Sequence, residues 1–126
     1  HALKFYDYLN GRGGRVELTQ IQAPKTQWSS ILEIFEEIYD HEQKVTASVN
    51  NVANVAFEER DFAAQAYIQW FVNEQVEEES NVAGIIEQLK LIGDNSSGIF
   101  MLDKDLAARV FVPAPPYDTN GGVAGI

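Results

Sequence analysis

An acidic residue occupies a position where the helical pattern of the sequence calls for an apolar one. Glu42 falls in a series of residues spaced alternately by four and three, and a later series contains Gln75 and Glu78 in the same way. Such spacing predicts one apolar helix face turned toward the inside of a bundle. The first series is Ile31, Phe35, Ile38, Glu42, Val45, Val49, Val52 and Ala56. The second is Ala64, Ile68, Phe71, Gln75, Glu78, Val82, Ile85, Leu89 and Ile92.

A carboxylate in a bundle core needs a cation, a proton or a metal ion beside it, because an unpaired buried charge is costly. Both interruptions fall near the middle of their helices, which predicts one shared polar site. Glu74 and Glu77 flank Gln75 and Glu78 on neighbouring rows of the same helix, where like charges repel. A solvated acidic face is the alternative, and we expect it for Glu77 and Glu79. Gln75 alone is also compatible with a satisfied buried amide.

The two histidines differ as candidate ligands. His1 shares helical spacing with Phe5 and Tyr8, and an imidazole would suit a core that already contains two glutamates and a glutamine. His41 lies one residue from Glu42, about 100° round a helix, and is expected at the surface or at an interface. Carboxylates with one imidazole favour iron, manganese or zinc, and two bridging acids favour a pair of iron ions.

The elements that position these residues are predicted to be helices. The chain starts as if midway along a helix that the glycines of 10–14 end, so we expect a truncated helix, with a short native helix as the alternative. Residues 15–27 read as an extended crossover, because no second strand is available for pairing. Ser29 or Ser30 can cap the next helix, expected over 30–58, with Glu33 as the reciprocal partner of Ser30.

Two further helices are predicted downstream. Asp61 can cap a helix that reaches Ile92, where Gly93 ends it, and a short amphipathic helix is expected over 99–110. The two long helices, each of about thirty residues, span roughly 40 Å and must be antiparallel neighbours because the turn between them is short. The long crossover would make the first helix parallel to the second. A bundle of four helices therefore lacks one in this chain.

Bulk composition excludes several classes of protein. The 126 residues carry a formal net charge of −10 and no cysteine. Nucleic acid is excluded as a partner because phosphate binding needs clustered Lys and Arg. No apolar run approaches the length of a membrane span, so no membrane partner is expected. The lack of cysteine rules out disulfides and thiolate metal sites, and it fits a cytoplasmic location. A surface of this sign attracts cations.

Four segments of the sequence resemble the non-haem ferritins of bacterial or cyanobacterial type, and together they are specific. They are His1–Leu9, Tyr39–Gln43, Trp70–Glu79 and Asp103–Leu106. The resemblance covers nearly the whole chain apart from its tail. It implies an all-α fold, a ferritin-like four-helix bundle with a long crossover and a short fifth helix, whose N-terminal part is missing here. It also implies a diiron domain over 1–112 and a flexible Pro/Gly-rich tail over 113–126.

The resemblance assigns roles to four of the candidate residues. His1 would close a Glu-x-x-His pair on the second bundle helix, with its glutamate lying before the first residue of this chain. Glu42 would be the third-helix ligand of the diiron ferroxidase centre. Gln75 and Glu78 would be the fourth-helix residues beside it.

An additional iron site is also implied by the resemblance, next to the diiron centre. Glu74 and Glu77 would form it together with Glu78. Haem-binding relatives carry a second Glu-x-x-His on the last bundle helix, but here Asn81 stands three residues after Glu78. Haem is therefore disfavoured as a cofactor.

The implied function is iron storage. Fe(II) would be oxidised by dioxygen or peroxide at the diiron centre, and ferric mineral would be deposited inside a homo-oligomeric cage of 24 subunits. One alternative is a diiron oxidoreductase of the rubrerythrin kind, which usually adds a cysteine-ligated iron domain, whereas this chain has no cysteine. The other is a non-catalytic helical assembly protein whose buried polar residues only fix register and oligomeric state.

Overall fold

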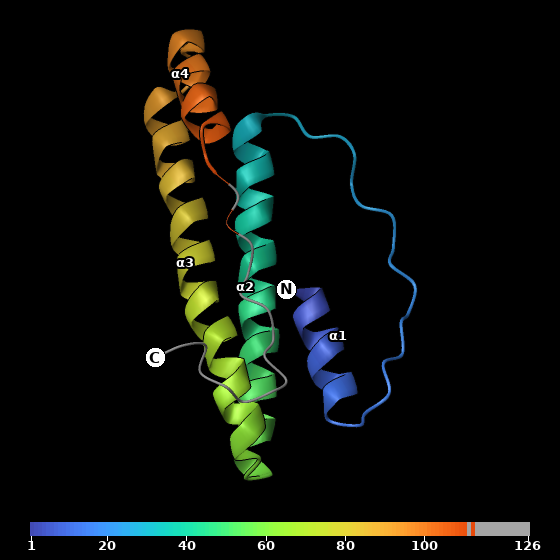
Figure 1. Ribbon diagram of the computed structural model, residues 1–126. Coiled ribbons are helices and arrows are strands. Elements are labelled where there is room, and N and C mark those ends of the chain that lie inside the picture. The colour runs from blue at the N-terminus through green and yellow to red at the C-terminus, as the bar shows by residue number, and fades with distance from the viewer. Residues whose placement is uncertain (111, 113–126) are drawn as a thin grey trace. The chain divides into compact units, whose positions relative to one another are not determined.

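The computed structural model describes residues 1–110 and 112, and these residues form four α-helices and no strand. The helices are α1 (Ala2–Gly11), α2 (Ile31–Glu58), α3 (Phe62–Ile92) and α4 (Ser96–Ala107) (Figure 1). The prediction of an all-α fold is therefore confirmed. Within the described range, none of the helices combines the length and apolar character that crossing a bilayer requires. The flexible tail predicted for residues 113–126 lies outside the described residues.

The chain divides into two compact units. One unit is Thr26–Ala107 and contains α2, α3 and α4; the other contains α1 and the segment up to Lys25, together with residues 108–110. In the second unit α1 ends in a turn, where the backbone N–H of Gly13, at φ +77°, donates to the carbonyl of Asn10 over 3.0 Å. No helix or strand forms between residues 12 and 30, as expected for an extended crossover.

Both long helices begin at capping residues that the sequence identifies. The hydroxyl of Ser30 accepts the backbone N–H of Glu33 over 3.0 Å. The carboxylate of Glu33 accepts the backbone N–H and the hydroxyl of Ser29, at 2.6 and 2.5 Å, so the reciprocal bond falls one residue earlier than predicted. At the start of α3 the carboxylate of Asp61 accepts the N–H of Ala64 over 3.0 Å. Each cap satisfies a donor that the helix itself cannot pair.

α2 and α3 form an antiparallel hairpin with a tight turn (Figure 1). Arg60 stands in the turn at φ +55°, the left-handed region that non-glycine residues rarely adopt. The N–H of Asp61 donates to the carbonyl of Ala56 over 3.0 Å and closes the turn. The two long helices are therefore held side by side along their length.

Two buried apolar clusters hold the Thr26–Ala107 unit together. The one nearer the turn contains Val49, Ile68 and Phe71, and the other contains Ile85, Leu89 and Leu102. The apolar face predicted for α3 is largely buried, whereas part of that predicted for α2 is not. The exposed members are Ile31 at 44%, Ile38 at 37% and Val52 at 45%. In this unit a single neighbouring long helix cannot cover an apolar stripe of at least about 100°.

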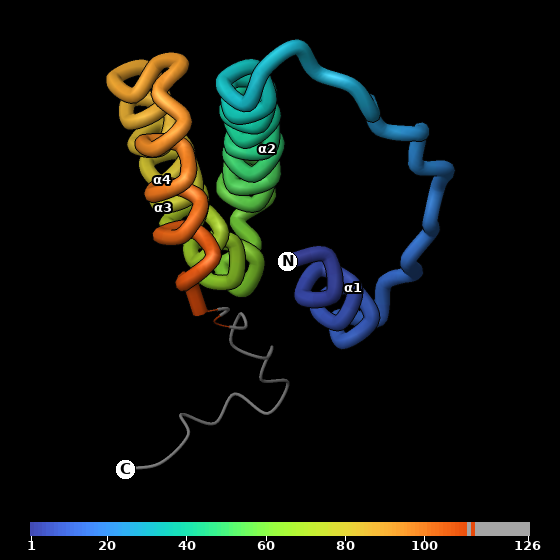
Figure 2. The backbone as a smooth tube through the Cα atoms, turned by 90° about the horizontal axis from the view of Figure 1, so that it is seen from above, coloured from blue at the N-terminus to red at the C-terminus, as the bar shows by residue number. Residues whose placement is uncertain are grey.

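α4 starts and ends three residues earlier than the predicted range 99–110. The reason is Asn95, whose side-chain oxygen accepts the N–H groups of Ser97 and Gly98, at 3.0 and 3.1 Å, and so caps a helix beginning at Ser96. The chain then reverses and α4 lies along α3 (Figure 2). Leu102 of α4 is buried in the cluster that Leu89 of α3 also joins.

Candidate metal centre

A polar layer crosses the hairpin between its two apolar clusters. Gln75 of α3 is only 4% exposed, as buried as the apolar residues around it. Along α3 it stands between Phe71 of one cluster and Ile85 of the other. Glu42 is the half-buried residue that faces it from α2. The polar interruptions that the sequence pattern places on two helices therefore meet.

The amide nitrogen of Gln75 is the centre of this layer. It donates to the carboxylate Oε2 of Glu42, to the backbone carbonyl of the same residue and to the hydroxyl of Thr46, each over 3.2 Å. The Thr46 hydroxyl in turn donates to Oε1 of Glu79 over 2.5 Å. These bonds connect two carboxylates, one on each helix, through an amide and a hydroxyl.

Within the Thr26–Ala107 unit no basic side chain pairs with Glu42. Two lysines of this unit have other partners: Lys44 pairs with Asp40 at 2.5 Å and Lys90 pairs with Glu36 at 3.1 Å. A half-buried carboxylate without a basic neighbour favours a cation at the same place. Carboxylate oxygens are hard donors, which suit iron, manganese or magnesium rather than a soft metal.

Glu74 and Glu78 add a second pair of carboxylates on α3. They are one helical turn apart and both half-buried, and a carboxylate oxygen of one lies within 4.8 Å of a carboxylate oxygen of the other. That separation allows both side chains to ligate one divalent cation after a small adjustment. Glu77, between them in sequence, is exposed, and its assignment as a ligand stays a prediction.

The two histidines lie on different units. His1 is the N-cap residue of α1 and is exposed, and its assignment as a ligand stays a prediction. His41 is exposed on α2, as expected for a residue at the surface or at an interface.

Thr46 and Glu79 are the polar residues of the layer that the sequence pattern did not single out. Glu79 was expected on a solvated acidic face, but this is wrong: the residue is half-buried and accepts the Thr46 hydroxyl. Thr46 follows Glu42 by one helical turn, and Glu79 follows Gln75 by one turn. That spacing was the available signal, because residues four apart share a helix face.

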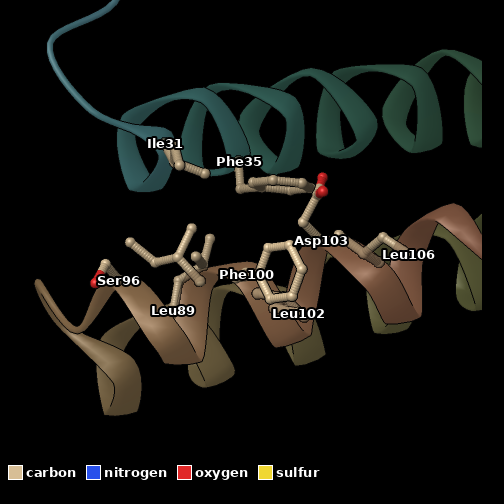
Figure 3. A pocket seen from close by; sticks show the side chains of 9 residues that line it. Ile31, Phe35, Leu89, Ser96, Phe100, Leu102, Asp103 and Leu106 are labelled. Carbon is tan, nitrogen blue, oxygen red and sulfur yellow. The ribbon is translucent and has the colours of Figure 1, made fainter.

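An apolar groove lies at the far end of the hairpin from the turn and has a different character. It has a volume of about 520 Å³ and is lined by the beginning of α2, the end of α3 and α4. Ile31 and Phe35 project from α2 toward Leu89 and Phe100 (Figure 3). Its polar lining residues are Ser96 and Asp103, too few to form a metal site. The polar layer is therefore the better candidate for a metal site.

Comparisons of the sequence and of the structure with known proteins identify one and the same family. Residues 1–92 match the family model of the ferritin-like domain. A bacterial non-haem ferritin of Staphylococcus saprophyticus is 44% identical over 111 residues, which are 88% of this chain and 66% of that protein. One of Staphylococcus aureus is 40% identical over 111 residues, 88% of this chain and 67% of that protein. The chain spans about two thirds of the length of these curated relatives.

Solved structures of archaeal ferritins have the same fold. A humanized archaeal ferritin superposes with a TM-score of 0.88 at 42% identity, covering 90% of this chain and 68% of the other. The open-pore ferritin of Archaeoglobus fulgidus superposes with a TM-score of 0.86 at 42% identity, covering 87% of this chain and 68% of the other.

Proposed function

The chain belongs to the ferritin family, and from this premise we propose that it stores iron. In this proposal it oxidises Fe(II) at a diiron ferroxidase centre and deposits ferric mineral inside a homo-oligomeric cage. The resemblance found in the sequence to non-haem ferritins of bacterial type is confirmed at the level of the family. Iron is the substrate and the cargo, and the residues described here supply its ligands.

One observation carries the proposal: the contact between Gln75 and Glu42 in the core of the hairpin. The amide nitrogen lies 3.2 Å from Oε2 of the carboxylate, and no basic residue of the Thr26–Ala107 unit pairs with that carboxylate. A polar layer without a protein cation is costly in the iron-free protein. Binding of a divalent cation offsets that cost, which supports a role in metal binding over a purely structural one.

The proposed ligands are His1, Glu42, Gln75 and Glu78 at the diiron centre, with Glu74 and Glu77 extending it to an additional iron site. Carboxylates hold Fe(II) and leave coordination positions open for an oxidant. Dioxygen or peroxide accepts the electrons that Fe(II) loses. The protein supplies charge, ligand number and orientation, and the redox step belongs to the metal and the oxidant.

The proposal extends to assembly and location. A cage of 24 subunits in the cytoplasm would enclose the mineral, as the family resemblance implies. The net charge of −10 supports this use, because an acidic surface raises the local concentration of cations.

Aerobic addition of Fe(II), followed by size-exclusion chromatography with iron and protein read together, tests the proposal. Co-elution of iron and protein at the mass of a cage is the expected result. A species that takes up no iron would overturn it and would favour the helical assembly protein, whose polar core only fixes register. Oxidation of Fe(II) without retention of a mineral would instead favour a diiron oxidoreductase.

A further inference from the structure

Thr46 and Glu79 support the amide of Gln75 without being candidate ligands themselves. The Thr46 hydroxyl lies 2.5 Å from Oε1 of Glu79 and 3.2 Å from Nε2 of Gln75. Both residues are half-buried. Together with Gln75 and Glu42 they form one continuous series of hydrogen bonds, in the order Glu79, Thr46, Gln75 and Glu42, that passes between α3 and α2 three times.

The single hydrogen of the Thr46 hydroxyl determines the direction of this series. A hydroxyl donates one hydrogen, and a carboxylate only accepts. Since Thr46 donates its hydrogen to Glu79, it can only accept from Gln75. The carboxylate and the backbone carbonyl of Glu42 are acceptors as well. All three groups around the end of the Gln75 side chain are therefore acceptors, which share the two hydrogens of its NH₂ group and which the amide oxygen could not serve.

The orientation of this amide affects Glu42 directly. With the nitrogen facing α2, Gln75 donates to the Glu42 carboxylate and restrains it. With the amide turned over, its oxygen would face that carboxylate and the two would repel. In the observed orientation the nitrogen, and not the oxygen, of the amide meets the three acceptors.

We propose that Thr46 and Glu79 are positioning residues that fix which end of the Gln75 amide faces Glu42, and thereby hold the Glu42 carboxylate in place to bind a divalent cation. The inference rests on the proposed function, in which Glu42 and Gln75 take part in Fe(II) binding. It assigns to these two residues a task that neither performs by touching the metal.

Replacement of the Thr46 hydroxyl tests the inference, with Co(II) as a probe that dioxygen does not readily oxidise in a carboxylate site. Thr46→Val removes the hydroxyl at nearly constant volume. We expect Co(II) to bind about tenfold more weakly, the size typical of losing a group that orients a ligand. The visible absorption bands of bound Co(II) should shift as well, because they report the arrangement of its ligands.

Two further variants separate positioning from packing. Thr46→Ser keeps a hydroxyl and should bind Co(II) with the affinity and spectrum of the parent protein. Ser48→Ala is the matched control, since it removes an exposed hydroxyl from the same helix that bonds only to the carbonyl of Lys44. It should change neither quantity. Parent-like affinity and spectrum in folded Thr46→Val protein would overturn the inference, and so would a failure of Thr46→Ser to restore them.

Glu79→Leu keeps the inference testable if Thr46→Val does not fold. This change leaves Thr46 in place but frees its hydrogen to turn toward Gln75, so weaker Co(II) binding is again expected. Unchanged binding in this variant would contradict the inference. Failure of the proposed function looks different: the parent protein would itself bind no Co(II) and oxidise no Fe(II), and both proposals would then fall together.

Discussion

The Nε2 atom of Gln75 lies 3.2 Å from both the backbone carbonyl oxygen and Oε2 of Glu42, thirty-three residues earlier in the chain. The carbonyl of Glu42 stands in the middle of α2, where it also serves the hydrogen-bond ladder of the helix. The amide uses the second lone pair of that oxygen. The position of the Gln75 side chain is therefore set by the backbone of α2 as well as by a side chain that can move.

Removal of one proposed iron ligand should slow Fe(II) oxidation and leave the fold intact. Glu78→Ala is expected to slow rapid Fe(II) oxidation at least about tenfold, because the centre loses a carboxylate donor. Stopped-flow absorbance after mixing with Fe(II) in air measures the rate, and circular dichroism checks the fold. Glu87→Ala, an exposed acid on the same helix, is the control and should oxidise iron at the parent rate. Undiminished oxidation in Glu78→Ala would remove this residue from the site.

The charge of Glu42 should cost stability when no metal is bound. Glu42→Leu is expected to raise the free energy of unfolding of the iron-free protein by about 1 kcal/mol, because a half-buried carboxylate without a basic partner is replaced by an apolar side chain. Gln75 keeps its bonds to the backbone carbonyl and to Thr46. Urea unfolding of the iron-free protein measures the change. A large loss of stability would mean that Glu42 is chiefly structural.

The N-terminal cap of α3 should contribute measurably to the stability of the hairpin. Asp61→Ala removes the acceptor that lies 3.0 Å from the N–H of Ala64 and should lower the free energy of unfolding by about 1 kcal/mol. Thermal unfolding monitored by circular dichroism measures it. Asp94→Ala changes an exposed acid after α3 and should have little effect. An equal loss in both variants would show that the effect is one of overall charge.

The turn between α2 and α3 holds strain that glycine would relieve. Arg60 adopts φ +55°, which costs an L-residue about 1–2 kcal/mol relative to glycine. Glycine loses more backbone entropy on folding, so Arg60→Gly should raise stability by a smaller amount, about 0.5 kcal/mol. Arg60→Ala keeps the strain and should not do so. Urea unfolding of both variants and of the parent protein measures the free energies of unfolding. A higher value for Arg60→Ala than for the parent protein would contradict this account.

The long helices and the central contact of the site could be predicted from the sequence. Alternating spacings of four and three place Glu42 and Gln75 on the inward faces of their helices, and a tight turn makes those helices antiparallel neighbours. The two residues then meet at similar distances from the turn. Capping residues supplied the boundaries, since Ser30 and Asp61 each bond to the N–H of the residue three positions later.

The same pattern did not identify Thr46 or Glu79. After Glu42 the series steps by three to Val45, and after Gln75 it steps by three to Glu78. Residues three and four positions later both share the inner face of a helix. The residues four positions later, Thr46 and Glu79, were not in the series, and they complete the polar layer. The start of α4 was missed for a comparable reason, because a single asparagine cap outweighed apolar periodicity.

The polar layer also fixes the alignment of the two long helices. If α3 slid along α2 by one turn, Gln75 would leave its acceptors and come to lie among the aliphatic and aromatic side chains of a neighbouring cluster. A buried donor left without a partner costs about 1–3 kcal/mol. Apolar clusters alone tolerate such slippage far better, since one aliphatic contact resembles the next. A mutation that makes this layer apolar would therefore also remove the contacts that fix the register of the hairpin.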